Sequence, residues 1–143
     1  MKKEVRIFSR AQFSIEYLVM MGFTLVLLIP TILLFATESE HIKSDIAISQ
    51  ASQIAREIAY KAEEMYYQGE PSKTTLKVNI PRGIENMTFQ NKEIIIYYKT
   101  SDNVILDISQ ITPINISGNI STVQGVHLIA IKSEGDYVSV SET

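Results

Sequence analysis

A stretch without any charged residue, from Tyr17 to Thr37, constrains this chain more than any other feature. As an α-helix rising about 1.5 Å per residue, these 21 residues would span about 31 Å. That length matches the hydrocarbon core of a bilayer, whereas the sequence after Thr37 is an ordinary mixture of polar and apolar residues. The sequence therefore predicts one transmembrane segment, at about 17–37, followed by a water-exposed domain.

The distribution of charge predicts the orientation of this segment. Residues 1–11 carry a net charge of +3, and the whole 143-residue chain carries −3, which leaves −6 for residues 12–143. Because positive flanks stay in the cytoplasm, we expect a single-pass membrane protein with a cytoplasmic amino terminus and an extracellular carboxy terminus. The acidic balance argues against nucleic-acid binding. The absence of cysteine excludes disulfides and thiol catalysis.

The apolar periodicity predicts a nearly continuous helix from about residue 13 to 67, with Pro30 inside it as a candidate kink. Beyond the uncharged stretch, two rows at four-residue spacing form an apolar stripe on one helix face: Ile42, Ile46, Ile54, Ile58 and Ala62, and beside them Ala47, Ala51, Ala55 and Ala59. The stripe fits the core of the following domain, or a contact surface for other copies of the chain. Gly69 and Pro71 end the helix.

The remainder, residues 69–143, reads as short strands separated by polar turns, with a loop over 111–121. Leu76, Val78 and Ile80 alternate with polar residues, as in a half-buried strand. About 70 residues are few for a self-sufficient β fold, so the long helix should complete the core. The predicted fold class is α+β: a long amino-terminal helix packed on a small antiparallel β-sheet or sandwich.

Glu16 is the one acidic residue between Phe13 and Thr37, at the start of the apolar helix. A buried carboxylate is costly in lipid unless it finds a partner. If a peptidase cuts between Ala11 and Gln12, the new ammonium group of Gln12 lies one helical turn from Glu16. It could pair within the chain, or with Glu16 of a neighbouring copy. The alternative is a glutamate at the headgroup level beside Tyr17 as an aromatic anchor.

The segment Arg10–Leu18 resembles the class III signal peptide of archaeal type IV pilin-like proteins, in which a basic and a small residue precede Gln-x-Ser-x-Glu-Tyr and an apolar helix. Gln12, Ser14, Glu16 and Tyr17 match that pattern, whereas Ala11 stands where glycine is common. A softer similarity extends into the second half of the chain, at 66–72, 80–84 and 134–138.

This resemblance implies a cleavable leader, residues 1–11, removed before Gln12 by a prepilin-type peptidase. It also implies extraction from membrane lipid by an assembly ATPase and a platform protein. Mature subunits would bundle their helices, residues 12–68, into a cell-surface filament, with Gln12, Glu16, Tyr17 and a kink at Pro30 serving assembly. Two alternatives stay open: a monomeric membrane-anchored binding or adhesion module, and a minor pilin of a secretion or uptake machine.

Other chemistry is sparse. Three Asn-x-Ser/Thr motifs, at Asn86, Asn115 and Asn119, are candidate N-glycosylation sites of an extracellular domain. His41, beside two glutamates, fits a solvated face better than a metal site, and His127 should be half buried in a strand. No nucleophile elbow or glycine-rich phosphate loop occurs, so we expect no enzyme, no cofactor and no bound metal.

Overall fold

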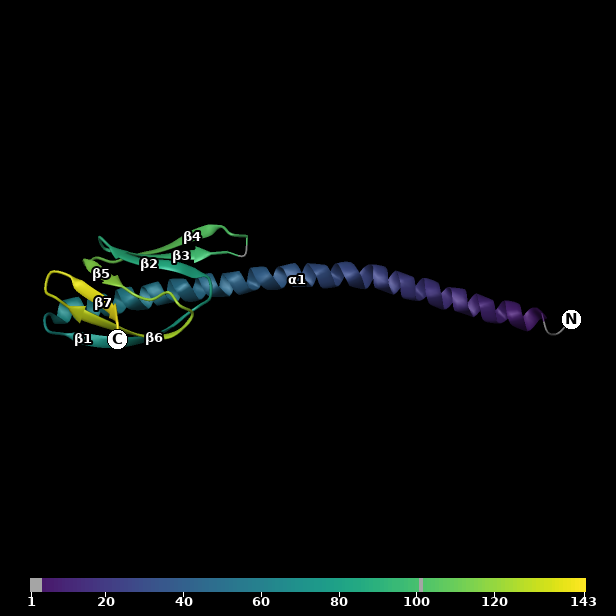
Figure 1. Ribbon diagram of the computed structural model, residues 1–143, viewed down its shortest axis with the longest axis horizontal. Coiled ribbons are helices and arrows are strands. Elements are labelled where there is room, and N and C mark those ends of the chain that lie inside the picture. The colour runs from purple at the N-terminus through teal and green to yellow at the C-terminus, as the bar shows by residue number, and fades with distance from the viewer. Residues whose placement is uncertain (1–3, 101) are drawn as a thin grey trace. The chain divides into compact units, whose positions relative to one another are not determined.

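The computed structural model describes the backbone of residues 4–100 and 102–143, and the side chains of residues 14–100 and 102–143 (Figure 1). One helix is followed by seven strands: α1 (Glu4–Gln68), β1 (Lys73–Ile80), β2 (Ile84–Gln90), β3 (Glu93–Lys99), β4 (Ile105–Ile111), β5 (Ile116–Asn119), β6 (Gly125–Ser133) and β7 (Val138–Glu142). The chain divides into two compact units between His41 and Ile42. The predicted α+β class is confirmed.

Helix α1 begins at Glu4, nine residues before the predicted start, so residues 4–11 of the expected leader are helical. Its carboxy end matches the prediction. Gly69 adopts φ +76° and donates its N–H to the carbonyl of Tyr66 (3.1 Å). The hydroxyl of Ser72 donates to the carbonyl of Met65 (2.7 Å), which would otherwise be left without a helical donor.

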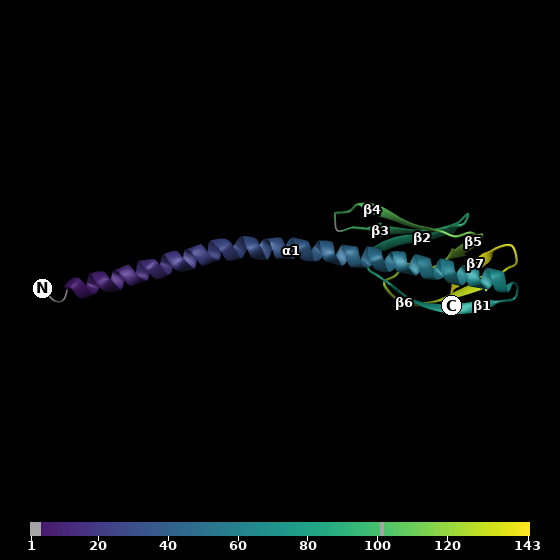
Figure 2. The same cartoon turned by 180° about the vertical axis from the view of Figure 1, so that it is seen from behind.

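The second unit, from Ile42 onward, contains a single seven-stranded sheet in the order β1-β6-β7-β5-β2-β3-β4 (Figures 1 and 2). All neighbouring strands are antiparallel except β5 and β7, which run parallel from the pair Ile116↔Val138 to the pair Asn119↔Ser141. The sheet is therefore mixed but mostly antiparallel, and the two edge strands are β1 and β4.

The loop predicted over residues 111–121 is wrong, because β5 lies within it. This strand has four residues, with one buried side chain, Ile116, and no period-two pattern to reveal it. It is held by distant segments: by β7 on one side and by Phe89 of β2, opposite Gly118, on the other. A Cβ on Gly118 would lie 2.1 Å from the carbonyl oxygen of Val140, so only glycine allows this close approach.

The carboxy-terminal part of α1 supplies one side of the core of the second unit. Both predicted rows are buried from residue 51 onward: Ala51, Ile54, Ala55, Ile58, Ala59 and Ala62 are each at most 6% exposed. They pack in one cluster with the inward side chains of the strands, such as Ile94, Ile129 and Val138. The core interpretation of the stripe is confirmed for these residues. The alanines are consequently not available as a surface for other copies.

The side chains at the amino-terminal end of the stripe are not part of the core. Ile42 and Ile46 belong to the same row as Ile54 and Ile58, yet they are 56% and 53% exposed. Periodicity alone could not show this limit, because it depends on how far the sheet extends along the helix.

Candidate functional site

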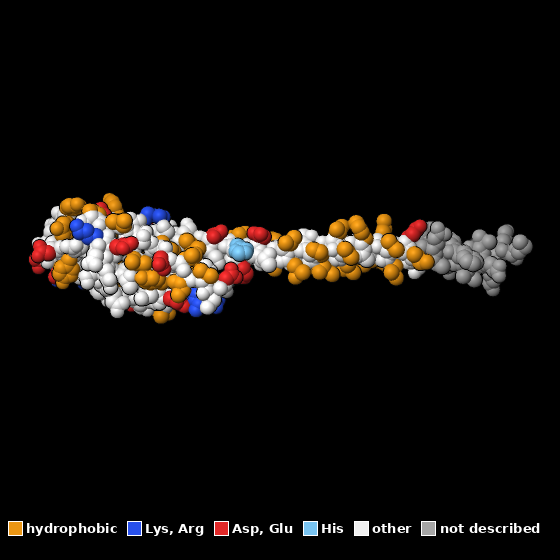
Figure 3. Space-filling model, turned by 90° about the horizontal axis from the view of Figure 1, so that it is seen from above, with side chains coloured by type: hydrophobic (Ala, Val, Ile, Leu, Met, Phe, Trp, Pro, Cys, Tyr) orange, Lys and Arg blue, Asp and Glu red, His pale blue; other side chains and the backbone are white. Residues whose placement is uncertain are grey.

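The candidate functional surface of the first unit is the exposed apolar stretch of α1. Among the described residues, one helix is long and apolar enough to cross a membrane, Ser14–Gln68, and none of its most apolar window is buried. Apolar side chains cover the visible face of this stretch (Figure 3). The core helix of a soluble protein would be mostly buried. By its length, composition and exposure, this helix could be a membrane span or a signal sequence.

The carboxylate of Glu16 lies at the start of this apolar stretch and is exposed, and Tyr17 is 66% exposed. Both side chains are therefore accessible to lipid or to another protein. Ala11 and Gln12 lie within the backbone of α1, but their side chains are outside the described residues. Cleavage between them, and pairing of the Gln12 ammonium with Glu16, remain predictions.

Pro30 lies inside α1, about two thirds of the way along the apolar stretch. Because proline has no N–H, the carbonyl of Val26 receives no hydrogen bond from residue 30. The hydroxyls of two nearby threonines donate hydrogen bonds to backbone carbonyls one turn earlier in the same helix. The hydroxyl of Thr24 donates to the carbonyl of Met20 (2.9 Å), and that of Thr31 donates to the carbonyl of Leu27 (2.8 Å). The helix can therefore enter an apolar environment with bonded hydroxyls and one weakened turn, at 26–30.

The three candidate glycosylation sites lie in the second unit and are all exposed. Asn86 belongs to β2, Asn119 is the last residue of β5, and Asn115 immediately precedes β5. The side-chain oxygen of Asn86 accepts a hydrogen bond from the backbone N–H of Met87 (2.8 Å). Exposure makes each site compatible with glycosylation, and whether any carries a glycan remains a prediction.

The predicted position of His127, half buried in a strand, is confirmed, but the sequence did not reveal its partners. Nδ1 lies 2.6 Å from Oε1 of Glu142, and Nε2 lies 2.7 Å from the carbonyl oxygen of Val123. The carbonyl of Val123 can only accept a hydrogen bond, so Nε2 donates to it, and the protonated ring can donate from Nδ1 to the ionised Glu142 at the same time. The hydrogen bond to Glu142 raises the pKa of His127 above 6.5, and the same bond lowers the pKa of Glu142 below 4.5.

The ion pair between His127 and Glu142 joins β6 to the carboxy-terminal strand β7, and the hydrogen bond from Nε2 to the carbonyl of Val123 holds the loop before β6. Glu142 also accepts a weak hydrogen bond from the backbone N–H of Ser121 (3.4 Å). His41, the other histidine, is exposed. Within the described part of the chain, no three histidine, aspartate or glutamate side chains gather as a metal site would require. The arrangement around His127 is a structural clamp between two chain segments.

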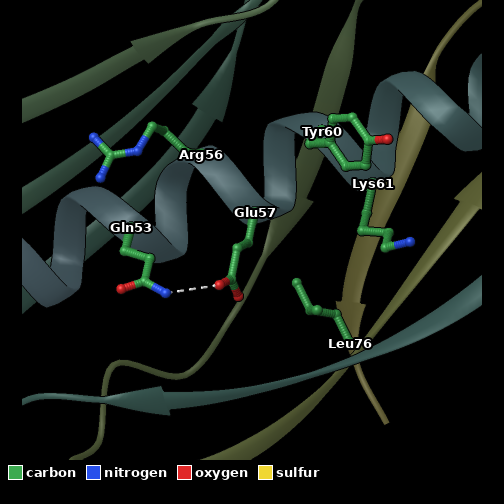
Figure 4. A pocket seen from close by; sticks show the side chains of 6 residues that line it. All are labelled: Gln53, Arg56, Glu57, Tyr60, Lys61 and Leu76. Carbon is green, nitrogen blue, oxygen red and sulfur yellow. Dashed lines mark hydrogen bonds between the residues drawn. The ribbon is translucent and has the colours of Figure 1, made fainter.

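A groove of about 360 Å³ runs between α1 and edge strand β1. Its walls are Gln53, Arg56, Glu57, Tyr60 and Lys61 of the helix, and Leu76 of the strand (Figure 4). Leu76 points from β1 toward the helix, and the amide of Gln53 donates to Glu57 (3.0 Å). A second hollow of about 180 Å³ shares Gln53 and Glu57 and extends past Lys77, Val78 and Asn79. The groove therefore follows the free edge of the sheet.

No protein-family model, no curated protein and no solved structure matches the chain. The architecture itself, a long apolar amino-terminal helix followed by a mostly antiparallel seven-stranded sheet, is consistent with a pilin-like protein. This agreement concerns the order and type of the elements.

Proposed function

We propose that this protein is the precursor of a subunit of a type IV pilus-like surface filament, cut before Gln12 and polymerised through its apolar helix. The observation that carries the proposal is the exposed apolar surface of α1 between Ser14 and Thr37, with Glu16 as its single charged residue. A prepilin-type peptidase would process the chain. An assembly ATPase and a platform protein would then extract it from the membrane.

The physical argument is an exchange of one apolar environment for another. A helix that leaves lipid for a bundle of similar helices loses little hydrophobic free energy, because both surroundings are apolar. Packing of the helices and pairing of polar groups then decide whether the bundle forms. Glu16 fits such a role, since an unpaired charge in a membrane helix is costly, up to about 2.5–3.5 kcal/mol at the helix centre on insertion scales, and Glu16 lies at the start of the apolar stretch. Pairing with the new amine of Gln12 on a neighbouring helix would remove much of that cost.

Substitution of Glu16 tests this proposal. Glu16→Ala should leave membrane insertion intact, because it makes the helix more apolar, but should abolish filaments. Glu38→Ala is the matched control, because it removes an exposed acidic residue just beyond the other end of the apolar stretch. Filaments can be counted by electron microscopy of sheared cells, and membrane insertion measured by fractionation. Normal filaments from Glu16→Ala would contradict the pairing of Glu16 with the amine.

The same experiment separates the filament subunit from the alternative of a monomeric anchored binding module. A monomeric module would form no filaments in either variant, and its surface display would not depend on Glu16.

A further inference from the structure

The sheet of the second unit ends in two free edges of similar length. Strand β1 has eight residues and β4 has seven, and they lie on opposite sides of this unit in both ribbon views (Figures 1 and 2). Proteins usually protect such edges with proline, bulges, very short strands or charged side chains, especially lysine. Strand β1 carries Lys73 and Lys77, so a strand that pairs with it should place an acidic residue opposite a lysine. Neither edge strand contains proline, and the register shift of the sheet lies in β2, between Ile84 and Asn86. Both edges can therefore accept another strand.

The hydrogen bonds of the sheet show which residues of β1 face the free edge. The N–H of Ser133 donates to the carbonyl of Ser72 (3.0 Å), so Ser72 and Ser133 form a bonded pair of the β1–β6 ladder. In an antiparallel ladder, bonded pairs recur at every second residue. The even-numbered residues of β1 thus face β6. The backbone groups that point to the free edge belong to Lys73, Thr75, Lys77 and Asn79.

The same reasoning applies to β4. The N–H of Thr112 donates to the carbonyl of Lys92 (2.8 Å), and the N–H of Thr100 donates to the carbonyl of Val104 (2.9 Å). Even-numbered residues of β4 therefore face β3. The backbone groups that point to the free edge belong to Ile105, Asp107, Ser109 and Ile111.

These two edges are complementary. Consider an antiparallel register that places Lys77 of one copy opposite Asp107 of another. The other residues whose backbone groups point to the free edges then also lie opposite each other: Lys73 and Ile111, Thr75 and Ser109, and Asn79 and Ile105. On the core-facing side of the sheet this register aligns Thr74 with Gln110, Leu76 with Ile108, Val78 with Leu106, and Ile80 with Val104. Opposite charges meet once, and the last three core-facing pairs are apolar.

We infer that edge strand β1 of one copy pairs antiparallel with edge strand β4 of a second copy, with Lys77 opposite Asp107, and that the sheet continues from copy to copy. The groove beside β1 offers apolar surface that β4 of the second copy would cover. Leu76 lines the groove and is half buried, and Ile108, which faces it across the new pair, is also half buried. Leu106 and Val104 are 39% and 53% exposed. Pairing would cover all four side chains.

Because the two paired edges differ, the copy that contributes β1 keeps its β4 edge free, and the copy that contributes β4 keeps its β1 edge free. Such a head-to-tail contact lets further subunits add in the same way, and it gives an open chain unless the rotation between copies closes into a ring. It is a second contact beyond the helix-mediated assembly proposed above. It involves only residues of the second unit, and it does not depend on cleavage before Gln12.

Disulfide trapping in full-length protein in membranes tests the register, since the chain contains no cysteine of its own. A chain carrying both Thr75→Cys and Ser109→Cys should give a ladder of covalent multimers on mild oxidation, because these positions lie opposite each other. The matched control carries Thr75→Cys and Ser117→Cys. Ser117 is equally an exposed serine on a strand, but it lies on β5 inside the sheet. Equal ladders from the two chains, or no ladder from the first, would overturn the inference.

Charge reversal provides a second test that a folding defect cannot imitate. In the Thr75→Cys, Ser109→Cys background, Lys77→Asp or Asp107→Lys alone should lower the yield of multimers roughly fivefold, because like charges then face each other. The two reversals together should restore the yield, since they recreate an opposite pair. Failure of the double reversal to restore it would overturn the assigned register.

The outcomes also separate this inference from the proposed function. Filaments without 75–109 cross-links would refute the edge contact and leave the helix-mediated filament intact. Cross-links that persist in Glu16→Ala membranes, where filaments are expected to be lost, would support an edge contact independent of the helix bundle.

Discussion

Replacing Ile58 with alanine should destabilise the second unit strongly, because this side chain completes a core that the sheet cannot close alone. Ile58 is 0% exposed and packs among side chains of the strands. Truncation of a fully buried isoleucine to alanine costs about 2–5 kcal/mol, from lost burial and from the cavity left behind. For a unit of about 100 residues, a loss of about 3 kcal/mol corresponds to a fall in Tm of roughly 12–24 °C.

Ile46→Ala is the matched control, because Ile46 occupies the same helical row three turns earlier and is 53% exposed. It should cost less than about 1 kcal/mol. Thermal unfolding of the full-length variants in detergent micelles can be followed by near-ultraviolet circular dichroism, for which the buried ring of Tyr98 is a probe. A similar Tm for Ile58→Ala and Ile46→Ala would refute the assignment of α1 to the core.

Two further predictions concern the second unit. Gly118→Ala should destabilise it by about 2–3 kcal/mol in urea unfolding, because the new Cβ would collide with the carbonyl oxygen of Val140; an unchanged midpoint would show that β5 can move away freely. The ion pair of His127 and Glu142 should stabilise the unit most at mildly acidic pH. The raised pKa of His127 makes its contribution full below 6.5 and lost as pH rises above the folded pKa, whereas the lowered pKa of Glu142 makes its contribution full above 4.5 and lost as pH falls. Unfolding midpoints between pH 6 and 9 should fall in the wild type and vary less in His127→Gln, and parallel profiles would contradict the assignment.

The elements that the sequence predicted well are those whose signal is local. The long helix and its stop at Gln68 follow from uninterrupted periodicity and from Gly69. The spacing of Ile54 and Ile58 places them on one apolar face of the helix, and the alternation of Leu76, Val78 and Ile80 marks β1. In each case the relevant neighbours lie within one or two turns, or along one strand, so residue type and spacing suffice.

The features that escaped prediction depend on segments that are far apart in the chain. Strand β5 exists because β7 and β2 flank it, and the bond from His127 to Glu142 requires the register of β6 against β7. The complementarity of the two sheet edges likewise needs the strand order and the ladder pattern, which no spacing in a single sequence contains. The start of α1 at Glu4 shows a different limit. The leader contains no proline or glycine that would break the helix, so the helix extends into it as far as Glu4.

The central claim is that the apolar helix stays in the mature protein and becomes the core of a polymer. The most direct measurement is intact-mass and amino-terminal peptide mass spectrometry of the protein in sheared surface fibres. The account predicts a chain that begins at Gln12 and still contains the residues from Tyr17 to Thr37. Fibres in which the chain begins at Met1, or surface protein that begins beyond Thr37, would contradict it.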